Sequence, residues 1–254
     1  MNRSHPPSPS PQVSVALATY NGRRWLPAQL DSVLSQLAAD DEVVVVDDAS
    51  RDGTPDWLRQ RGDARLRLFA SAVNRGVRAS FTQALSHCRG QYVFLCDQDD
   101  LWLPGKRDAL VEALDRGALV AVSDAQVIDA DGRVIEDSFM ARRGGFRGGF
   151  LHTLAKNRYL GCAMAFRREL LDEALPIPTS VPMHDMWIGA LASLRGRVAY
   201  IDRPLMQYRR HGGNVSPERR AGLAQMLAWR WQLLRLVTAR RLRGPRRFTS
   251  EAFD

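Results

Sequence analysis

Long apolar runs are missing from the sequence. No stretch approaches the ~18 uncharged apolar residues that a membrane span requires, and the N-terminal MNRSHPPSPSPQ lacks the apolar core of a secretory signal. We therefore expect a cytoplasmic protein in which residues 1–12 form a disordered leader.

Cysteine is scarce. Cys88, Cys96 and Cys162 are odd in number and far apart, which argues against a disulfide framework and against a zinc site. Because apolar residues surround them, we expect buried thiols.

Neither positive nor negative charge is in excess over residues 1–200. Residues 201–254 hold 12 arginines and 4 acids of the chain's 36 basic and 28 acidic residues, so 24 of each remain in residues 1–200. The net charge of +8 therefore lies entirely at the C-terminal end.

Apolar patterns of strands and helices alternate through the first hundred residues. Strands are expected at residues 13–18, 43–46, 66–71 and 92–97, and helices at 26–37, around Trp57 and at 77–88. This order predicts an α/β protein with a doubly wound, mostly parallel sheet flanked by helices. Ligands of such sheets bind at the carboxyl ends of the strands.

The pattern is less regular after Pro104. We expect strands at residues 119–122, 162–166 and 198–202, and a hairpin in VIDADGRVI. The glycine-rich RRGGFRGGF is either a loop that closes over a ligand or a plain connector.

The segment 217–254 is expected to be a basic helical extension. Six apolar residues share one face of its helix: Leu223, Met226, Leu227, Trp231, Leu234 and Val237. The helix either lies on an anionic membrane surface or packs on the domain with a solvated basic end. Nucleic-acid binding is a weaker alternative, because no recognised nucleic-acid motif accompanies the charges.

Acids follow two of the expected strands. Glycine-rich phosphate motifs are absent after the first strand, which ends in ATYNGRR. Asp97, Asp99 and Asp100 instead crowd the end of the fourth strand, and carboxylates hold a diphosphate only through a cation such as Mg²⁺ or Mn²⁺. The alternative is that Asp99 or Asp100 caps a following helix.

Four further residues are open to a functional and a structural interpretation. Asp48, with Asp47 before it, would bind ribose or base, and one of the two would instead or also cap a helix. Tyr20 would stack on a base or lie partly buried at the sheet edge. Asp185 is a candidate general base, although an acid that begins a helix is also favourable with the helix dipole.

Four motifs resemble one family of enzymes. VSVALATYNG, DEVVVVDDASRDGT, NRGVRASFTQAL and YVFLCDQDDLWLPGK, in this order, are similar to the inverting nucleotide-sugar glycosyltransferases of family 2, which have a GT-A fold. The segments GCAMAFRREL and HDMWIGALASLRGRVAYIDRPLMQYRRHGGNVS resemble the rhamnosyltransferase-like branch. Two positions differ from many members of the family. Position 184 is His, as it often is in the rhamnosyltransferase-like branch, and position 18 is Ala, where some members have a hydroxyl side chain.

The resemblance implies a role for each matching residue. Asp185 would be the general base, and Asp99 with His211 would hold the metal. The remaining contacts would come from Thr19, Tyr20, Asn21, Asp48, Asn74, Arg75, Gly76 and Asp97 to the nucleotide, and from Asp100, Trp102, His184 and Arg210 to the sugar or diphosphate. Arg209 would assist as a phosphate clamp.

These observations predict a metal-dependent glycosyltransferase of bacterial surface polysaccharide assembly. The favoured donor is dTDP-rhamnose, with a UDP-sugar as the alternative, and the acceptor is a glycan or a lipid-linked glycan at the inner membrane face. The GT-A domain would span residues 13–216, with a nucleotide half at 13–106 and an acceptor half at 107–216. A nucleotidyltransferase and a non-catalytic nucleotide-binding protein are the alternative functions.

Overall fold

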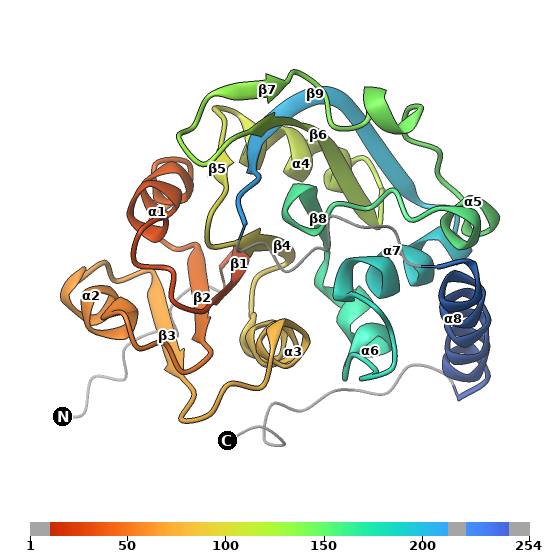
Figure 1. The fold of residues 1–254 in the computed structure, drawn as a ribbon, viewed down its shortest axis with the longest axis horizontal. Helices are drawn as coiled ribbons and strands as arrows, with labels where there is room; N and C mark the ends of the chain where they lie inside the picture. Colours follow the sequence, from red (N-terminus) through yellow and green to blue (C-terminus); the bar gives the residue numbers. More distant parts are fainter. Residues whose placement is uncertain (1–10, 213–221, 244–254) are drawn as a thin grey trace, which may run out of the picture.

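A single mixed sheet forms the centre of the molecule (Figure 1). The computed structural model describes residues 11–212 and 222–243. The strands are β1 (Val13–Thr19), β2 (Glu42–Asp47), β3 (Leu66–Ala70), β4 (Tyr92–Asp97), β5 (Leu101–Trp102), β6 (Val120–Ile128), β7 (Val134–Glu136), β8 (Met164–Arg167) and β9 (Val198–Arg209). Their order is β3-β2-β1-β4-β8-β6-β9-β5, with β7 paired to β6.

Helices cover both faces of this sheet. They are α1 (Leu26–Leu34), α2 (Thr54–Gln60), α3 (Val77–His87), α4 (Lys106–Asp115), α5 (Phe150–Ala155), α6 (Leu171–Ala174), α7 (His184–Leu194) and α8 (Leu223–Arg243), with short 3-10 turns η1 (Ala141–Arg143), η2 (Gly161–Ala163) and η3 (Arg168–Leu170). The expected α/β architecture is confirmed.

The first four long strands are parallel, as expected. β1 pairs in parallel with β2 and β4, and β2 with β3. Side chains alternate along β2, so Val44 and Val46 enter the core on the α3 side, whereas Val43 and Val45 enter the core on the α1 side. Burial on both faces explains why these strands read as continuous apolar runs.

The second half departs from simple alternation. β8 runs antiparallel to both of its neighbours, β4 and β6, whereas β9 runs parallel to β6. β9 extends to Arg209, seven residues beyond the expected strand 198–202, and carries the chain back to the end of β4. The expected hairpin is present as β6 and β7, with Gly132 at φ 86° in its turn.

The alternative interpretation of the acids, that Asp99 or Asp100 caps a following helix, is wrong. Leu101 and Trp102 do not follow a helix cap but form β5, which pairs with β9, and α4 begins only at Lys106 after Gly105. The residues Asp99 and Asp100 therefore do not cap a helix. A two-residue strand has no periodicity from which the sequence could predict it.

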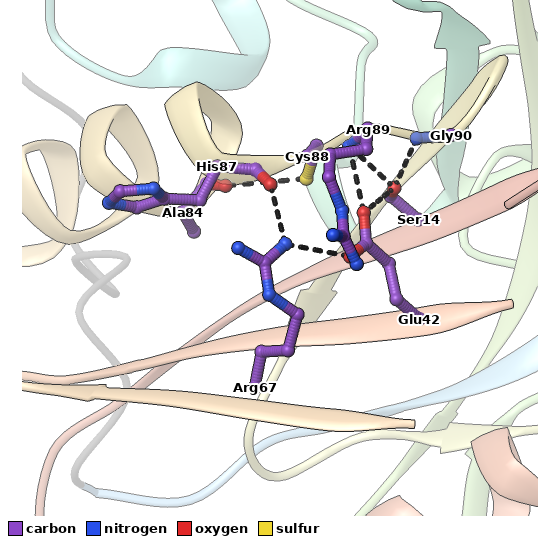
Figure 2. A network of polar contacts seen from close by, with 8 residues as sticks. All are labelled: Ser14, Glu42, Arg67, Ala84, His87, Cys88, Arg89 and Gly90. Atoms are coloured by element: carbon purple, nitrogen blue, oxygen red, sulfur yellow. Dashed lines mark hydrogen bonds and ion pairs between the residues drawn. The ribbon is translucent and has the colours of Figure 1, made fainter. Parts of the chain in front are cut away.

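A buried ionic network ties the strands together at the end opposite the acids (Figure 2). Glu42, at the start of β2, is almost fully buried and accepts hydrogen bonds from Ser14 (2.6 Å), Arg67 (2.7 Å) and Arg89 (2.9 Å). Burial raises the pKa of Glu42, but these hydrogen bonds outweigh it and leave the pKa below its usual value. The network links β1, β2 and β3 to the loop after α3.

α8 packs against α5 and α7 at the side of the molecule (Figure 1). Leu233 and Val237 are buried there, whereas Leu227 and Trp231, which we expected on the same apolar face as Val237, are exposed. Of the expected leader, residues 1–10 lie outside the described residues, as do residues 213–221 and 244–254 of the C-terminal region. Among the described helices, none combines the length and hydropathy needed to cross a membrane.

Candidate active site

The carboxyl ends of β1 and β4 meet at one edge of the sheet. Thr19 ends β1, and Gln98 follows β4 and joins the two. Gln98 Oε1 accepts from the Thr19 hydroxyl (2.7 Å) and the Tyr20 N–H (2.8 Å), and its amide group donates to the Tyr20 carbonyl. A Cβ on Gly22 would lie 2.3 Å from Gln98 Oε1, so only glycine fits beside this contact. The sequence analysis did not identify Gln98, which positions the Thr19 side chain and the Tyr20 backbone.

A second set of hydrogen bonds joins the loop after β1 to the loop after β2. Asn21 Oδ1 accepts the Arg51 N–H, and the Asn21 N–H donates to the Ser50 hydroxyl. Asp47 in turn accepts from the backbone and hydroxyl of Ser50. These contacts hold Asn21 at φ 49° and leave Tyr20 47% exposed, so its ring is available to a ligand.

Asp48 holds the loop that precedes α3. Its two carboxylate oxygens accept the N–H groups of Arg75 (2.8 Å) and Gly76 (2.7 Å). Gly76 has φ 84°, a conformation that favours glycine. Asn74 and Arg75 are exposed on the same loop. The structure therefore places Asp48 as the support of this loop.

A cavity of about 260 Å³ opens beside that loop. Asp48, Arg75 and Arg78 line it from the β2 and α3 side, and Pro176 and Thr179 line it from the segment between α6 and α7. Two of the expected nucleotide residues thus share a cavity with cationic side chains. The other six are not part of its lining: Thr19, Tyr20, Asn21, Asn74, Gly76 and Asp97.

Asp99 and His211 meet at the end of β4. Asp99 Oδ2 lies 2.8 Å from His211 Nε2, and the His211 ring stacks on Trp25. Arg209 braces this pair: its Nε donates to the Asp99 carbonyl and its guanidinium lies 4.6 Å from the centre of the Trp25 ring. A carboxylate oxygen and an imidazole nitrogen at this separation suit a divalent metal ion.

Asp97 and Asp100 form a second acidic group with Cys162. One ligand atom of each lies within 4.8 Å of the others. Burial is the main cause that raises the pKa of Asp97 to about 7, and the charges of Asp99 and Asp185 add to this shift. Burial and the neighbouring acids also raise the pKa of Asp100, whose Oδ1 accepts the Arg209 N–H. A nearby cation would lower the pKa of both acids.

A buried lysine offsets part of the negative charge of Asp97 and Asp100. Lys106 is completely buried, and its ammonium donates to the Cys162 carbonyl at 2.5 Å and lies over the Trp102 ring. Burial lowers the pKa of Lys106 below its usual value, and the nearby thiols and acids offset only part of this shift. Trp102 packs on Phe94 in the core and is only 4% exposed, so its ring does not line the site in this structure.

Asp185 lies in the first turn of α7, close enough to Asp97 to raise its pKa. Burial raises the pKa of Asp185 to about 6, although the N–H groups of Met186 and Gly161 lower it. A carboxyl group with this pKa can take a proton near neutral pH.

His184 is a packing residue in this structure. It is 3% exposed and stacks on Phe81, and burial lowers its pKa to about 3. The imidazole is therefore uncharged at neutral pH. Gly161 in η2 closes over it, since a Cβ there would lie 3.2 Å from His184 Nε2 and 3.3 Å from the Asp185 Cβ.

Two arginines lie close to each other, and one of them is near Asp185. Arg143 in η1 exerts its charge on Asp185 and packs on Phe139. Arg210 is half-buried, donates a long hydrogen bond to Tyr208 and is near enough to Arg143 to lower its pKa. The RRGGFRGGF segment therefore contributes a charge to the site, which its composition did not reveal.

Residues 14–175 match the family model described as Glycosyl transferase family 2. The succinoglycan biosynthesis protein ExoO of Rhizobium meliloti is 35% identical over 48% of this chain and 36% of its own length. The chain spans 66% and 36% of the first two curated relatives it matches.

Two solved structures have the same fold. TarS of S. aureus, solved with UDP-GlcNAc, has a TM-score of 0.66 and 19% identity over 95% of this chain and 69% of its own. The mannosyltransferase PcManGT of Pyrobaculum calidifontis, solved with GDP-Man and Mn²⁺, has a TM-score of 0.56 and 26% identity over 94% of this chain and 66% of its own.

Proposed function

The chain belongs to glycosyl transferase family 2, and from this premise we propose that it transfers a sugar from a nucleotide-diphosphate donor to a glycan hydroxyl, with inversion at the anomeric carbon. The alternatives of a nucleotidyltransferase and a non-catalytic protein lose support, because residues 14–175 match the model of a glycosyl transferase family.

One observation carries the proposal. Asp99, which lies 2.8 Å from His211, and Asp185 both act electrostatically on Asp97, so the proposed metal ligands and the proposed base lie close to the same carboxylate. Donor chemistry and acceptor chemistry thus have separate carboxylates in one site. Inversion requires this separation, because the nucleophile attacks from the face opposite the leaving group.

Asp185 is the proposed general base. It would accept the proton of the acceptor hydroxyl as the oxygen attacks the anomeric carbon, and the bond from that carbon to the diphosphate would break. Its pKa of about 6 leaves it ionised at neutral pH while close enough to that pH to be an effective base.

Asp99 and His211 are the proposed metal ligands, with Asp97 and Asp100 supporting them. Bound Mg²⁺ or Mn²⁺ would offset the charge of the diphosphate as it leaves. The mixed oxygen and nitrogen donors favour Mn²⁺ of the two, and PcManGT was solved with that ion. Arg75 and Arg210 would add cationic contacts to nucleotide and diphosphate.

The donor that we propose is dTDP-rhamnose, on the resemblance of the second half of the chain to rhamnosyltransferase-like enzymes. A UDP-sugar is the competing donor, and TarS was solved with one. We propose a glycan or lipid-linked glycan of bacterial polysaccharide assembly as acceptor, at the inner face of the cytoplasmic membrane, a role consistent with the name of ExoO.

Calorimetric titration tests the proposal. The full chain is titrated with dTDP, UDP and GDP, each with and without Mn²⁺, and the series is repeated with Asp99→Asn and Asp185→Asn. We expect Mn²⁺-dependent binding of one nucleotide that Asp99→Asn weakens and Asp185→Asn retains. Binding that is indifferent to both Mn²⁺ and Asp99 would contradict the donor site, and the nucleotide ranking decides between dTDP and UDP donors.

A further inference from the structure

α8 is anchored to the domain along one face. Leu233 and Val237 are buried against the core that includes α7. Arg230 donates to the carbonyls of Leu154 (2.8 Å) and Ala155 (2.5 Å) at the end of α5, and Arg240 donates to the Pro176 carbonyl. These contacts fix which face of α8 points outward.

Three large apolar residues lie on the outward face, together with Arg235 and Thr238. Leu227, Trp231 and Leu242 are 61%, 63% and 83% exposed. Residues 227, 231, 235, 238 and 242 recur at intervals of three and four, so they form one stripe along the helix. Single exposed leucines are common on protein surfaces, but an apolar stripe with an outward tryptophan marks an interaction surface.

The charge of α8 has a single sign. Its 21 residues contain five arginines and no acidic residue. Arg230 and Arg240 donate to backbone carbonyls, whereas Arg235 lies within the stripe and Arg241 beside it, both exposed. The outward face therefore combines apolar contact area with positive charge. A complementary partner has anionic groups at its surface and an apolar layer beneath them.

We propose that this stripe, defined by Leu227, Trp231, Arg235 and Leu242, binds the surface of an anionic lipid bilayer. The helix lies parallel to the membrane plane, with Leu227, Trp231 and Leu242 at the boundary between headgroups and acyl chains. Tryptophan prefers this boundary because its ring is apolar and its indole N–H is polar. The arginines pair with lipid phosphates.

A second copy of the chain fits this face less well. A symmetric contact would bring two α8 stripes together, and each carries arginines without acids to neutralise them. Like charges at a contact are unfavourable. A bilayer of anionic lipids supplies the missing negative charge.

α8 is connected to the candidate active site through α7. It packs on α7, and the first turn of α7 carries Asp185. Docking through α8 would therefore hold the enzyme at the bilayer that carries a lipid-linked acceptor. This last consequence rests on the proposed function, whereas lipid binding itself does not.

Vesicle co-sedimentation of the full chain tests the proposal. Vesicles of phosphatidylcholine alone are compared with vesicles that also contain phosphatidylglycerol. We expect binding to the anionic vesicles, weakened roughly tenfold by Leu227→Gln/Trp231→Gln and to a similar extent by Arg235→Gln/Arg241→Gln. The first pair leaves every arginine in place, so it separates the stripe from the charge of the rest of the C-terminal segment.

Two matched double variants serve as controls. Val134→Gln/Ile135→Gln removes two exposed apolar residues from β7, and Arg59→Gln/Arg116→Gln removes two exposed positive charges, one in α2 and one directly after α4. Both should bind vesicles like the wild type, and circular dichroism should show all variants folded. Nucleotide titration of the stripe variants should match the wild type, so loss of lipid binding is distinguished from failure of the donor site.

Three results would overturn the proposal. The first is unchanged vesicle binding by Leu227→Gln/Trp231→Gln, and the second is equal binding of the wild type to neutral and anionic vesicles. The third is a wild-type dimer in sedimentation velocity that Leu227→Gln/Trp231→Gln abolishes, while the wild type binds no vesicles. The last result would assign the stripe to a second copy of the chain.

Discussion

Asp99 Oδ2 and His211 Nε2 lie 2.8 Å apart although 112 residues separate them in the chain. β9 produces this contact, because its twelve residues run beside β6 and β5 and end at Arg209, next to the turn after β4. Arg209 then fixes the turn by donating to the Asp99 carbonyl and, through its N–H, to Asp100. The proposed ligand pair therefore depends on the length of β9 as much as on its own side chains.

Loss of either member of this pair should weaken metal binding. Asp99→Asn and His211→Gln are each expected to lower the affinity for Mn²⁺ at least about tenfold, because one ligand is removed from the pair. Calorimetric titration with Mn²⁺ in the presence of nucleotide measures the change. His152→Gln, on exposed α5, is the matched control; equal affinities in all four proteins would refute the assignment.

Asp185→Asn should separate catalysis from binding. We expect the turnover number to fall roughly 10²–10⁴-fold, the range for loss of a positioned general base. The free energy of unfolding should rise by roughly 1–3 kcal/mol at neutral pH, because the variant no longer buries a charge whose pKa folding has raised. Donor turnover and thermal denaturation measure the two effects, and a fully active variant would exclude Asp185 as the base.

The pH dependence of the reaction should report the same carboxyl group. The pKa of Asp185 is raised to about 6, so the ionised base predominates above that pH and is lost as the pH falls. The rate constant kcat/KM should be level above pH 6 and decrease about tenfold per pH unit below it. A profile that remains level down to pH 4.5 would show that no group with this pKa takes part.

Gly161→Ala should disturb Asp185 by steric contact while leaving its carboxyl group in place. The new Cβ would lie 3.2 Å from His184 Nε2, and His184 has no room to withdraw because it stacks on Phe81. We expect a loss of roughly 1–3 kcal/mol in unfolding free energy, together with reduced turnover. Gly148→Ala, where a Cβ meets only ordinary contacts, is the control for both measurements.

Glu42→Gln should affect stability alone. It leaves Arg67 and Arg89 without their shared carboxylate at the end of the sheet opposite the site, and we expect a loss of roughly 2–3 kcal/mol. The pKa of Glu42 is lowered by folding, so its contribution is present above the usual pKa of a glutamate and disappears as the pH falls below it. Chemical denaturation at pH 7 and pH 4 should show a smaller difference between wild type and variant at pH 4, and nucleotide affinity should not change.

The sequence by itself determined the first half of the fold. Residues 13–97 alternate continuous apolar strands with helices whose apolar residues recur on one face, and this pattern is local, so it can be read without tertiary information. It also determined that acids gather at the strand ends, since the end of a strand and the residue after it are adjacent in the chain. The resemblance to family 2 rested on the same local motifs.

Only the tertiary structure decided how the second half completes the site. β5 has two residues, and β9 contains Pro204 and charged residues, so neither has a pattern that predicts its length. Trp102 and His184 lie in local sequences typical of ligand contacts, but packing on Phe94 and Phe81 buries both. α8 shows the same limit: its sequence is apolar on more than one side, and only contact with α5 and α7 selects the face that is buried and leaves Trp231 exposed. Such choices depend on free energies of burial between segments distant in the chain, which no local pattern contains.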